Sequence, residues 1–236
     1  KASMHVIKEL LAWNCSGVHV KDERGWTALH FACENEAPVA VISLLLEAAF
    51  LNDVNNVDND VTQANNDVNG VDDASFRTLT GTNTWKTNNG TTPLHLACRY
   101  SSSLAVLKLL VETFPASVHL LDHGFRSPLH LAAQGNASGP IIELLLQKFP
   151  SSILMADSDS FLPIHHVVSQ KNCTAGVVKR LLDVAPETSL QPVNDGRLAI
   201  HMAAKNCPVL PVVKTLIQLD HARASAYTGV TGTGMT

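Results

Sequence analysis

Five short stretches of the chain repeat one pattern, and this repetition limits the possible folds more than any other feature. Each stretch places a histidine in a small apolar run: GWTALHFAC, GTTPLHLAC, FRSPLHLAA, SFLPIHHVV and GRLAIHMAA. The histidines follow one another at intervals of 65, 35, 35 and 36 residues, and they are His30, His95, His130, His165 and His201. A period of about 20 to 50 residues is typical of solenoids, in which each unit packs only against its neighbours.

A second apolar segment follows each histidine. These segments are VAVISLLLEAA, LAVLKLLVET, PIIELLLQKF, GVVKRLLDVA and PVVKTLIQL. Leu, Val or Ile recur in each at the i, i+3, i+4 and i+7 spacing of an amphipathic helix. Because proline cannot continue a helix, Pro115, Pro150 and Pro186 are predicted to end three of them. The residues that lengthen the later repeats follow these prolines.

The sequence Thr-Pro-Leu-His-x-Ala at residues 92–97 resembles the signature of the ankyrin repeat. The resemblance extends over nearly the whole chain except residues 51–89, because four partial matches accompany this one. It implies an all-α repeat solenoid of stacked helix-turn-helix repeats, joined by loops that form β-turn fingers.

The motif spacing divides the chain into segments. Residues 1–19 are predicted to hold the second helix of a partial preceding repeat, and residues 222–236 the start of a further repeat or a tail. Neither end shows the polar outer face that a terminal repeat needs, so further repeats or another domain are expected to flank both. Repeats are predicted at 20–50, 85–119, 120–154, 155–190 and 191–221, with an insertion at 51–84.

The resemblance implies that the five repeat histidines are structural. A neutral imidazole can donate and accept hydrogen bonds at once, and the first turn of a helix leaves groups that need partners. Hydroxyl residues that can cap the first helix stand three residues before the histidine at Thr27, Thr92 and Ser127. Leu162 and Leu198 replace the hydroxyl in the last two repeats, so weaker caps are expected there.

The finger positions match the family only in part. The family places Asp eight residues and Gly five residues before the histidine, because the turn needs a positive φ there. The positions that fit are Asp22, Asp122, Asp157, Gly25, Gly90 and Gly196. Those that depart are Thr87, Val193, Phe125 and Ser160. Gly124 lies one place early, so that finger is expected to be reshaped.

An insertion rich in Asn and Asp interrupts the repeats. The interval from Glu47 to His95 is 30 residues longer than the equivalent interval from Glu112 to His130. Its composition favours turns, and a long surface loop costs little stability, so a solvated loop is the first interpretation. Two alternatives stay open. Phe76, Leu79 and Trp85 could anchor the segment or bind a partner, and Asp58, Asp60 and Asp67 could bind calcium, although no EF-hand pattern is present.

Composition excludes several classes of function. The net charge of −4 resides in residues 51–89, and no basic stripe indicates nucleic-acid binding. No apolar run reaches the roughly 18 residues of a membrane span. Aromatic residues make up only 5% of the chain, so the core is expected to consist of Leu, Val, Ile and Ala.

The cysteines and histidines do not form a recognisable catalytic or metal motif. The five cysteines, Cys15, Cys33, Cys98, Cys173 and Cys207, are odd in number and scattered, which indicates reduced thiols in an intracellular, reducing compartment. The cytoplasm is the first choice, with association with an organelle as the alternative. Cys33 and Cys98 follow their histidines by three residues and are predicted to be small buried residues. Cys15 and His19 are four residues apart and are a poor pair for binding zinc. Because no catalytic or metal motif is recognisable, we expect no enzyme, cofactor, metal or small-molecule substrate.

We therefore expect a non-enzymatic scaffold that presents a concave surface to another protein or a multi-protein assembly. The candidate contact residues on the fingers are Arg24, Trp26, Phe125, Arg126, Phe161 and Arg197. The candidates at the end of each first helix are Glu34, Arg99, Tyr100, Gln134, Gln170 and Lys205. Aromatic and Arg residues dominate binding hot spots, which favours Trp26, Phe125 and Phe161 as the centre. The alternatives are a structural or linker subunit held in a large assembly, or the regulatory region of a larger enzyme or channel.

Overall fold

The computed structural model describes residues 4–13, 15–56, 85–100, 102–207 and 209–218. Two compact units divide the chain, Lys1–His123 and Gly124–Thr236. Within the described residues every regular element is a helix, which confirms the predicted all-α architecture. None of the described helices is long and apolar enough to cross a membrane.

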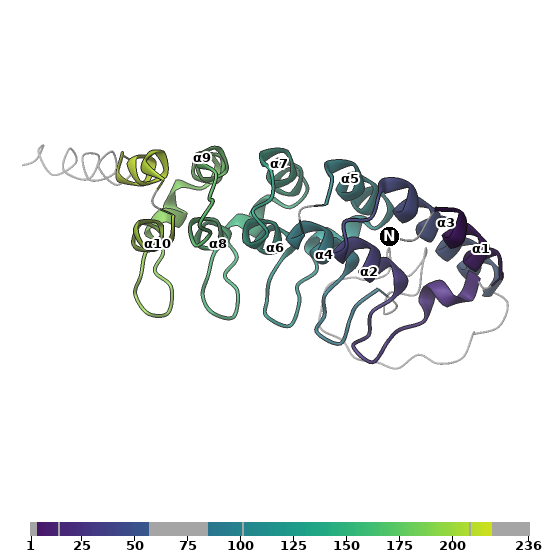
Figure 1. The fold of residues 1–236 in the computed structure, drawn as a ribbon. Helices are drawn as coiled ribbons and strands as arrows, with labels where there is room; N and C mark the ends of the chain where they lie inside the picture. The colour runs from purple at the N-terminus through teal and green to yellow at the C-terminus, as the bar shows by residue number, and fades with distance from the viewer. Residues whose placement is uncertain (1–3, 14, 57–84, 101, 208, 219–236) are drawn as a thin grey trace, which may run out of the picture. The chain divides into compact units, whose positions relative to one another are not determined.

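The first unit contains two helical pairs preceded by a single helix (Figure 1). Its elements are α1 (Met4–Trp13), η1 (Cys15–His19), α2 (Ala28–Glu34), α3 (Val39–Asn56), α4 (Pro93–Arg99), α5 (Leu104–Thr113) and η3 (Pro115–His119). Helix α2 packs on α4, while α3 packs between α1 and α5. Helix α1 therefore lies beside α3 in the row of second helices.

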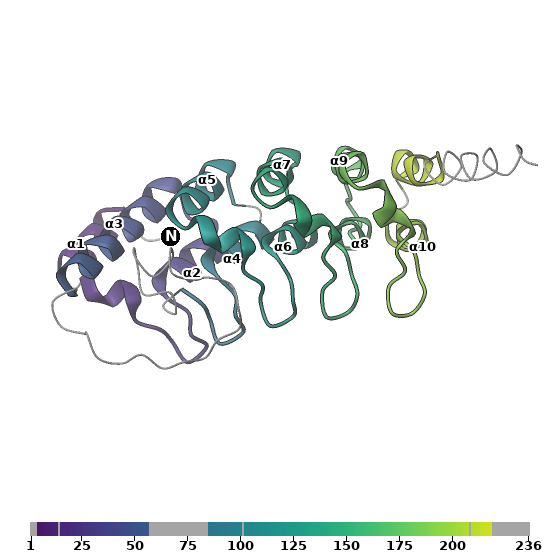
Figure 2. The ribbon, with the colours of Figure 1, turned by 180° about the vertical axis from the view of Figure 1, so that it is seen from behind.

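The second unit repeats this arrangement. Its elements are α6 (Pro128–Gln134), α7 (Gly139–Lys148), η4 (Pro150–Leu154), α8 (Pro163–Val168), α9 (Ala175–Val184), η5 (Pro186–Leu190) and α10 (Ala199–Asn206), followed by a helix at 210–218. Helices α6, α8 and α10 form one row and α7 and α9 a second, and the fingers project from the side of the first row (Figures 1 and 2).

Aliphatic side chains form the core of each unit, as the low aromatic content predicts. Fully buried residues of the first unit include Leu29, Ile42, Leu94, Leu107 and Leu110. Their counterparts in the second unit include Leu129, Ile142, Leu145, Ile164 and Leu181. Burial of one such side chain stabilises the fold by roughly 1.5–3 kcal/mol, so packing between helices supplies most of the stability of a solenoid.

The residues that lengthen the later repeats form short 3₁₀ helices. As predicted, α5, α7 and α9 end before Pro115, Pro150 and Pro186, and each proline begins one of the elements η3, η4 and η5. Two residues later a hydroxyl donates a 2.6 Å hydrogen bond to the last carbonyl before the proline, from Ser117, Ser152 and Thr188. The backbone N–H of the same residue donates to that carbonyl as well, so the hydroxyl adds a second hydrogen bond at the helix end, which favours Ser or Thr there.

The predicted insertion begins inside a helix. Helix α3 continues to Asn56, six residues beyond the predicted end of the repeat at residue 50. Residues 57–84 lie outside the described residues, and with them Phe76, Leu79 and the proposed calcium ligands Asp58, Asp60 and Asp67. Trp85 is only 4% exposed, and its ring centroid lies 5.5 Å from that of Phe114. Trp85 is therefore part of the core of the first unit and is inaccessible to a partner.

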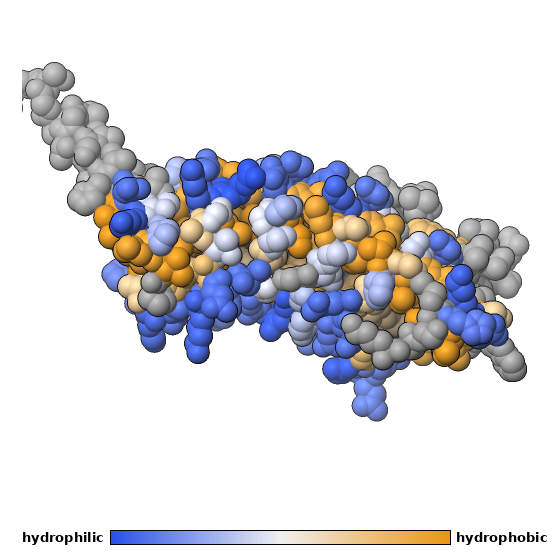
Figure 3. Space-filling model, turned by 45° about the horizontal axis from the view of Figure 1, so that its top comes forward, coloured by the Kyte–Doolittle hydropathy of each residue, from blue (hydrophilic) through white to orange (hydrophobic). Residues whose placement is uncertain are grey.

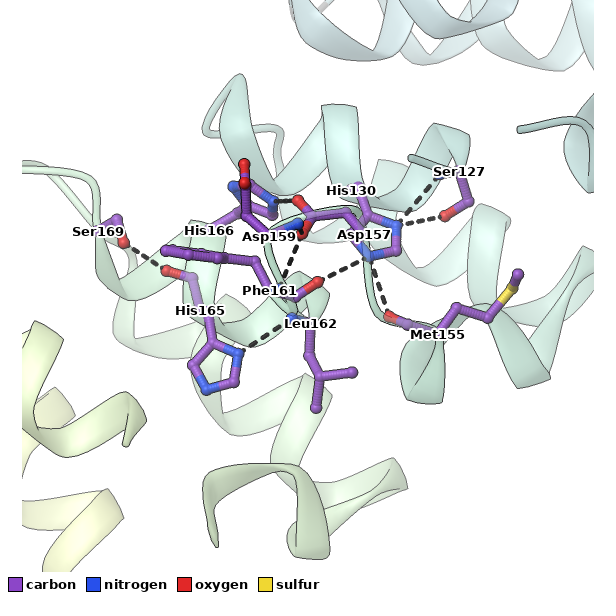
Figure 4. Close-up of polar contacts among 10 residues, drawn as sticks. All are labelled: Ser127, His130, Met155, Asp157, Asp159, Phe161, Leu162, His165, His166 and Ser169. Atoms are coloured by element: carbon purple, nitrogen blue, oxygen red, sulfur yellow. Dashed lines mark hydrogen bonds and ion pairs between the residues drawn. The ribbon is translucent and has the colours of Figure 1, made fainter. Parts of the chain in front are cut away.

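Each repeat histidine accepts hydrogen bonds at Nδ1 from the residue that precedes its own helix. The backbone N–H of Ser127 donates to His130 Nδ1 over 3.2 Å, and Ser127 Oγ lies 2.8 Å from the same nitrogen (Figure 4). Thr27 and Thr92 make the same pair of contacts. Leu162 and Leu198 keep the N–H donor but have no hydroxyl, so the weaker caps predicted there follow from the missing contact.

The other ring nitrogen connects the repeat to the next finger. Because Nδ1 accepts a backbone N–H, the proton lies on Nε2, which donates to carbonyl groups. His130 Nε2 lies 3.0 Å from the carbonyl oxygen of Met155 and 3.2 Å from that of Phe161 (Figure 4). His165 Nε2 contacts the Gln191 carbonyl at 3.1 Å, and His30 Nε2 the Thr91 carbonyl at 3.4 Å. His201 caps its own helix through Nδ1 but is exposed.

Burial keeps these rings neutral. Desolvation is the largest cause that lowers the pKa of His30, His130 and His165 to about 4 each. The hydrogen bonds from Nε2 to backbone carbonyls oppose this change but do not outweigh it. A neutral imidazole that is hydrogen-bonded at both nitrogens can link two repeats, and it is a poor proton shuttle near neutral pH.

Acid should therefore destabilise the fold through these rings. The unfolded histidine has a pKa near 6.5, so between pH 6.5 and about 4 the unfolded chain binds more protons than the folded chain. The contribution of these histidines to the free energy of unfolding should be greatest above pH 6.5. It should fall as the pH approaches 4, by at most on the order of 3 kcal/mol per histidine. Urea denaturation at stepped pH values measures this slope.

The variant His130→Ala separates this effect from general acid unfolding. At pH 7 it should lower the free energy of unfolding by about 2 kcal/mol, because buried carbonyls lose their donor. It should also make the pH dependence shallower than that of the wild-type chain. Equal slopes in the two proteins would contradict the structural role of His130.

The cysteines differ from the prediction. Cys33 and Cys98 are buried as expected, and burial raises the pKa of both thiols, that of Cys33 to about 12. Cys173 and Cys207, however, are joined by a disulfide, with Cα atoms 6.0 Å apart. The expectation of reduced thiols is thus wrong for this pair, because stacking of adjacent repeats brings together two loops that are 34 residues apart.

Loss of this disulfide should destabilise the second unit. A crosslink that closes a loop of this length lowers the conformational entropy of the unfolded chain and so stabilises the fold by roughly 4 kcal/mol. Cys173→Ser and a reducing agent should each lower the free energy of unfolding by a similar amount, and the reducing agent should have no further effect on the variant. Peptide mapping without reduction identifies the linked pair, and recovery of two unlinked peptides would contradict the assignment.

Candidate protein-binding surface

An aspartate side chain shapes the turn of two fingers. Asp22 Oδ1 accepts the N–H of Arg24 at 2.9 Å and of Trp26 at 2.8 Å. Asp157 Oδ1 accepts the N–H of Asp159 at 3.0 Å and of Phe161 at 2.8 Å. The hydrogen bonds from the backbone N–H groups of Trp26 and Arg24, that of Trp26 first, lower the pKa of Asp22. The turn thus places residues 26 and 161 at equivalent positions at the base of their fingers.

Another side chain replaces the aspartate where the sequence departs from the family. Thr87 Oγ1 accepts the N–H of Asn89 at 3.3 Å and of Thr91 at 3.1 Å, so a hydroxyl performs the same task. In the last finger Asp195, two residues after Val193, accepts the N–H of Arg197.

The backbone at the fifth position before the histidine is left-handed in all five repeats. The φ angles are +78° at Gly25, +73° at Gly90 and +80° at Gly196, and they are +56° at Phe125 and +62° at Ser160. Phe125 thus adopts the left-handed conformation that glycine has at this position in three other fingers. A side chain with a Cβ is strained in this region by roughly 1–2 kcal/mol.

Trp26 is packed inside its own repeat. Its ring centroid lies 5.2 Å from that of Phe31, and the Arg24 guanidinium carbon lies 4.6 Å above the Trp26 ring. Arg24 is held in turn by Asp22, with Nε and Oδ2 3.2 Å apart. The cluster leaves Trp26 half-buried and Phe31 38% exposed. Local packing, the competing interpretation for an aromatic finger residue, therefore accounts for much of the Trp26 surface.

Phe161 packs beside a buried hydrogen bond between His166 and Asp157 that sequence reasoning missed. His166 Nε2 lies 2.8 Å from Asp157 Oδ2, and the Phe161 ring centroid lies 5.3 Å from that of His166 (Figure 4). Desolvation is the largest cause that lowers the pKa of His166, although Asp157 opposes it. An adjacent histidine pair is a poor signal for this contact, because only the fold brings position 157 to position 166.

Phe125 differs from the other two rings because it is 60% exposed. The remaining candidates range between these extremes. Arg126, Arg197, Glu34, Arg99, Gln134 and Gln170 are half-buried, while Arg24, Tyr100 and Lys205 are exposed. Among the three aromatic finger residues, Phe125 thus has the largest surface available to a partner.

Exposed apolar residues also occur away from the fingers. Leu154 is 53% exposed and Val184 is 52% exposed. Figure 3 shows hydrophobic residues between hydrophilic margins on one face of the molecule. Exposed aliphatic residues are common on protein surfaces, so Leu154 and Val184 are weaker evidence for binding than a strained aromatic residue.

The comparisons agree with the geometry. A family model described as ankyrin repeats, three copies, matches residues 1–114 and 67–157, which together exceed half of the chain. This chain belongs to the ankyrin-repeat family. A search of the curated proteins found no match. Ankyrin repeats generally mediate protein–protein interactions and are typically non-catalytic, so protein partners are the general expectation for this solenoid.

In the described part of the ankyrin solenoid, no group of three or more His, Cys, Asp or Glu residues could hold a metal ion. Among the described residues, His166 hydrogen-bonds with Asp157 and not with a hydroxyl or thiol that it could activate. The arrangement is suited to presentation of side chains on fingers.

Substitution of Phe125 should reveal the strain at this finger. Phe125→Gly should raise the free energy of unfolding by about 1 kcal/mol, because glycine adopts a positive φ without penalty. Phe125→Ala keeps the strain and removes only an exposed ring, so it should change stability by less than about 0.5 kcal/mol. Chemical denaturation of both variants measures the difference, and an alanine variant as stable as the glycine variant would refute the strain.

Proposed function

We propose that this chain is a non-enzymatic scaffold that binds a partner protein through its fingers, with Phe125 at the centre of the contact. One observation carries the proposal: an aromatic ring that is 60% exposed occupies a backbone position with φ of +56°, which favours glycine. The position costs stability, and exposure of the ring to water adds nothing to the fold. Strain of this kind is concentrated at functional sites.

The surroundings of Phe125 support a protein partner. Arg126 follows it on the same finger and is half-buried, and Arg and aromatic residues are the types that dominate binding hot spots. In the same unit, Gln134 is half-buried at the end of α6, and Gln170 is half-buried two residues beyond the end of α8. A rigid aromatic centre with polar side chains around it is the usual composition of a specific interface.

The experiment uses the full chain as bait and separates binding from folding. The wild-type chain captures proteins from an extract of the source cells, and each captured protein is purified and titrated against the variants. Phe125→Gly and Phe125→Ala should both weaken binding by about tenfold or more, although the glycine variant is the more stable protein.

Ser160→Gly is the matched control. It replaces the residue with a Cβ at the equivalent positive-φ position of the next finger, and it removes a small side chain where Phe125→Gly removes a ring. It should leave the affinity for the captured protein unchanged. A purified partner that binds Phe125→Gly as tightly as Ser160→Gly would contradict the proposal.

A further inference from the structure

A polar pocket of about 540 Å³ lies among the fingers of the first unit. It is formed by the end of η1, the leading segments of two successive fingers and the start of a third. Its ionisable side chains are His19, Lys21, Lys86 and His123. None of these belongs to the surface predicted from the sequence, because the family resemblance directs attention to the finger tips and first helices.

Every ionisable residue that lines this pocket is basic, and no aspartate or glutamate is among its described lining residues. Asp22, the acidic neighbour of Lys21, is committed to its own turn through Arg24 and Trp26. The described lining therefore contributes two lysines and two histidines to one space. In a protein with a net charge of −4, this local excess of positive charge is informative.

The walls of the pocket are held in place before any ligand arrives. Lys21 Nζ donates to the Lys86 carbonyl over 2.9 Å, which fixes an ammonium group at the junction of two fingers. Asn88 Nδ2 donates to the Glu23 carbonyl over 2.9 Å, and the N–H of His123 donates to the Asn89 carbonyl over 2.9 Å. A preorganised site loses less conformational entropy on binding than flexible lysines on an open surface.

Glycine permits this close approach of the fingers. A Cβ at Gly90 would lie 2.9 Å from His123 Cδ2, and a Cβ at Gly25 would lie 2.6 Å from Asn88 Oδ1. Both glycines also have a positive φ, so their absence of a side chain satisfies two requirements at once. The pocket thus depends on the positive-φ glycine at the turn of each of these two fingers.

We infer that this pocket binds a carboxylate-rich segment of the partner protein, an inference that rests on the proposed function. Side-chain carboxylates can accept hydrogen bonds from the Lys21 and Lys86 ammonium groups and from imidazole N–H groups. The volume falls within the roughly 300–1,000 Å³ of known ligand sites, so the pocket has room for acidic side chains of a partner segment. Phe125 would then provide the apolar contact and the pocket a charged one.

The test uses a fluorescent peptide of eight glutamates, with a peptide of eight glutamines as the neutral probe, and fluorescence anisotropy with the full chain. The glutamate peptide should bind at least about tenfold more tightly than the glutamine peptide at low salt. Its affinity should fall as salt screens the charges. Equal binding of both peptides would overturn the inference.

A charge-matched pair of variants locates the binding. The double variant Lys21→Gln with Lys86→Gln should lower the affinity for the glutamate peptide by about fivefold or more, because two partly exposed charge pairs are lost. Lys108→Gln with Lys179→Gln removes the same charge from exposed helical positions and should change the affinity by less than about twofold. Thermal melts verify that each protein is folded, and equal effects of the two pairs would show nonspecific attraction and contradict the site.

Two further probes separate the sources of negative charge. Inorganic phosphate at matched ionic strength, or a twelve-nucleotide single-stranded DNA, should compete poorly with the peptide. If either binds more tightly than the peptide and depends on Lys21 and Lys86, the pocket recognises phosphate and the inference is overturned. If the peptide does not bind while partner capture still depends on Phe125, the inference fails and the proposed function stands. If the peptide binds while Phe125→Gly retains the partner, the proposed function fails and the pocket remains.

Discussion

The structure depends on one interaction, the neutral histidine that bonds its own helix start through Nδ1 and the next finger through Nε2. His130 shows the full arrangement, with Ser127 on one side and the carbonyls of Met155 and Phe161 on the other. Each helix pair alone cannot bury its apolar face, so stability arises between repeats. The imidazole determines how closely a finger lies to the preceding helix, and with it the position of every side chain that the finger presents.

Much of the fold could be predicted because its signals are local and repeated. The proline ends at 115, 150 and 186, the weaker caps at Leu162 and Leu198 and the aliphatic core all follow from residue type and spacing. The disulfide between Cys173 and Cys207 could not, because two scattered cysteines give no pairing signal until the stacking of repeats is known. The predicted reducing compartment rested on these thiols, so it loses that support.

The candidate surface was predictable by position and not by exposure. Trp26, Phe125 and Phe161 read alike in sequence as aromatic finger residues, yet Trp26 packs under Arg24, Phe161 packs against His166, and Phe125 is open to solvent. The difference arises from tertiary neighbours. The basic pocket was missed for the same reason, because Lys21, Lys86 and His123 are distant in sequence and meet only when successive fingers stack.

The disulfide has a mechanical consequence for a solenoid. A stack of repeats that is pulled from its ends extends as repeats unravel, and a chain contributes at most about 3.5 Å per residue. The crosslink between Cys173 and Cys207 withholds 34 residue steps from that extension, on the order of 120 Å of contour length. Tension applied through the chain would therefore bypass the loop that contains α9 and α10, and those helices would remain tethered while other repeats lengthen.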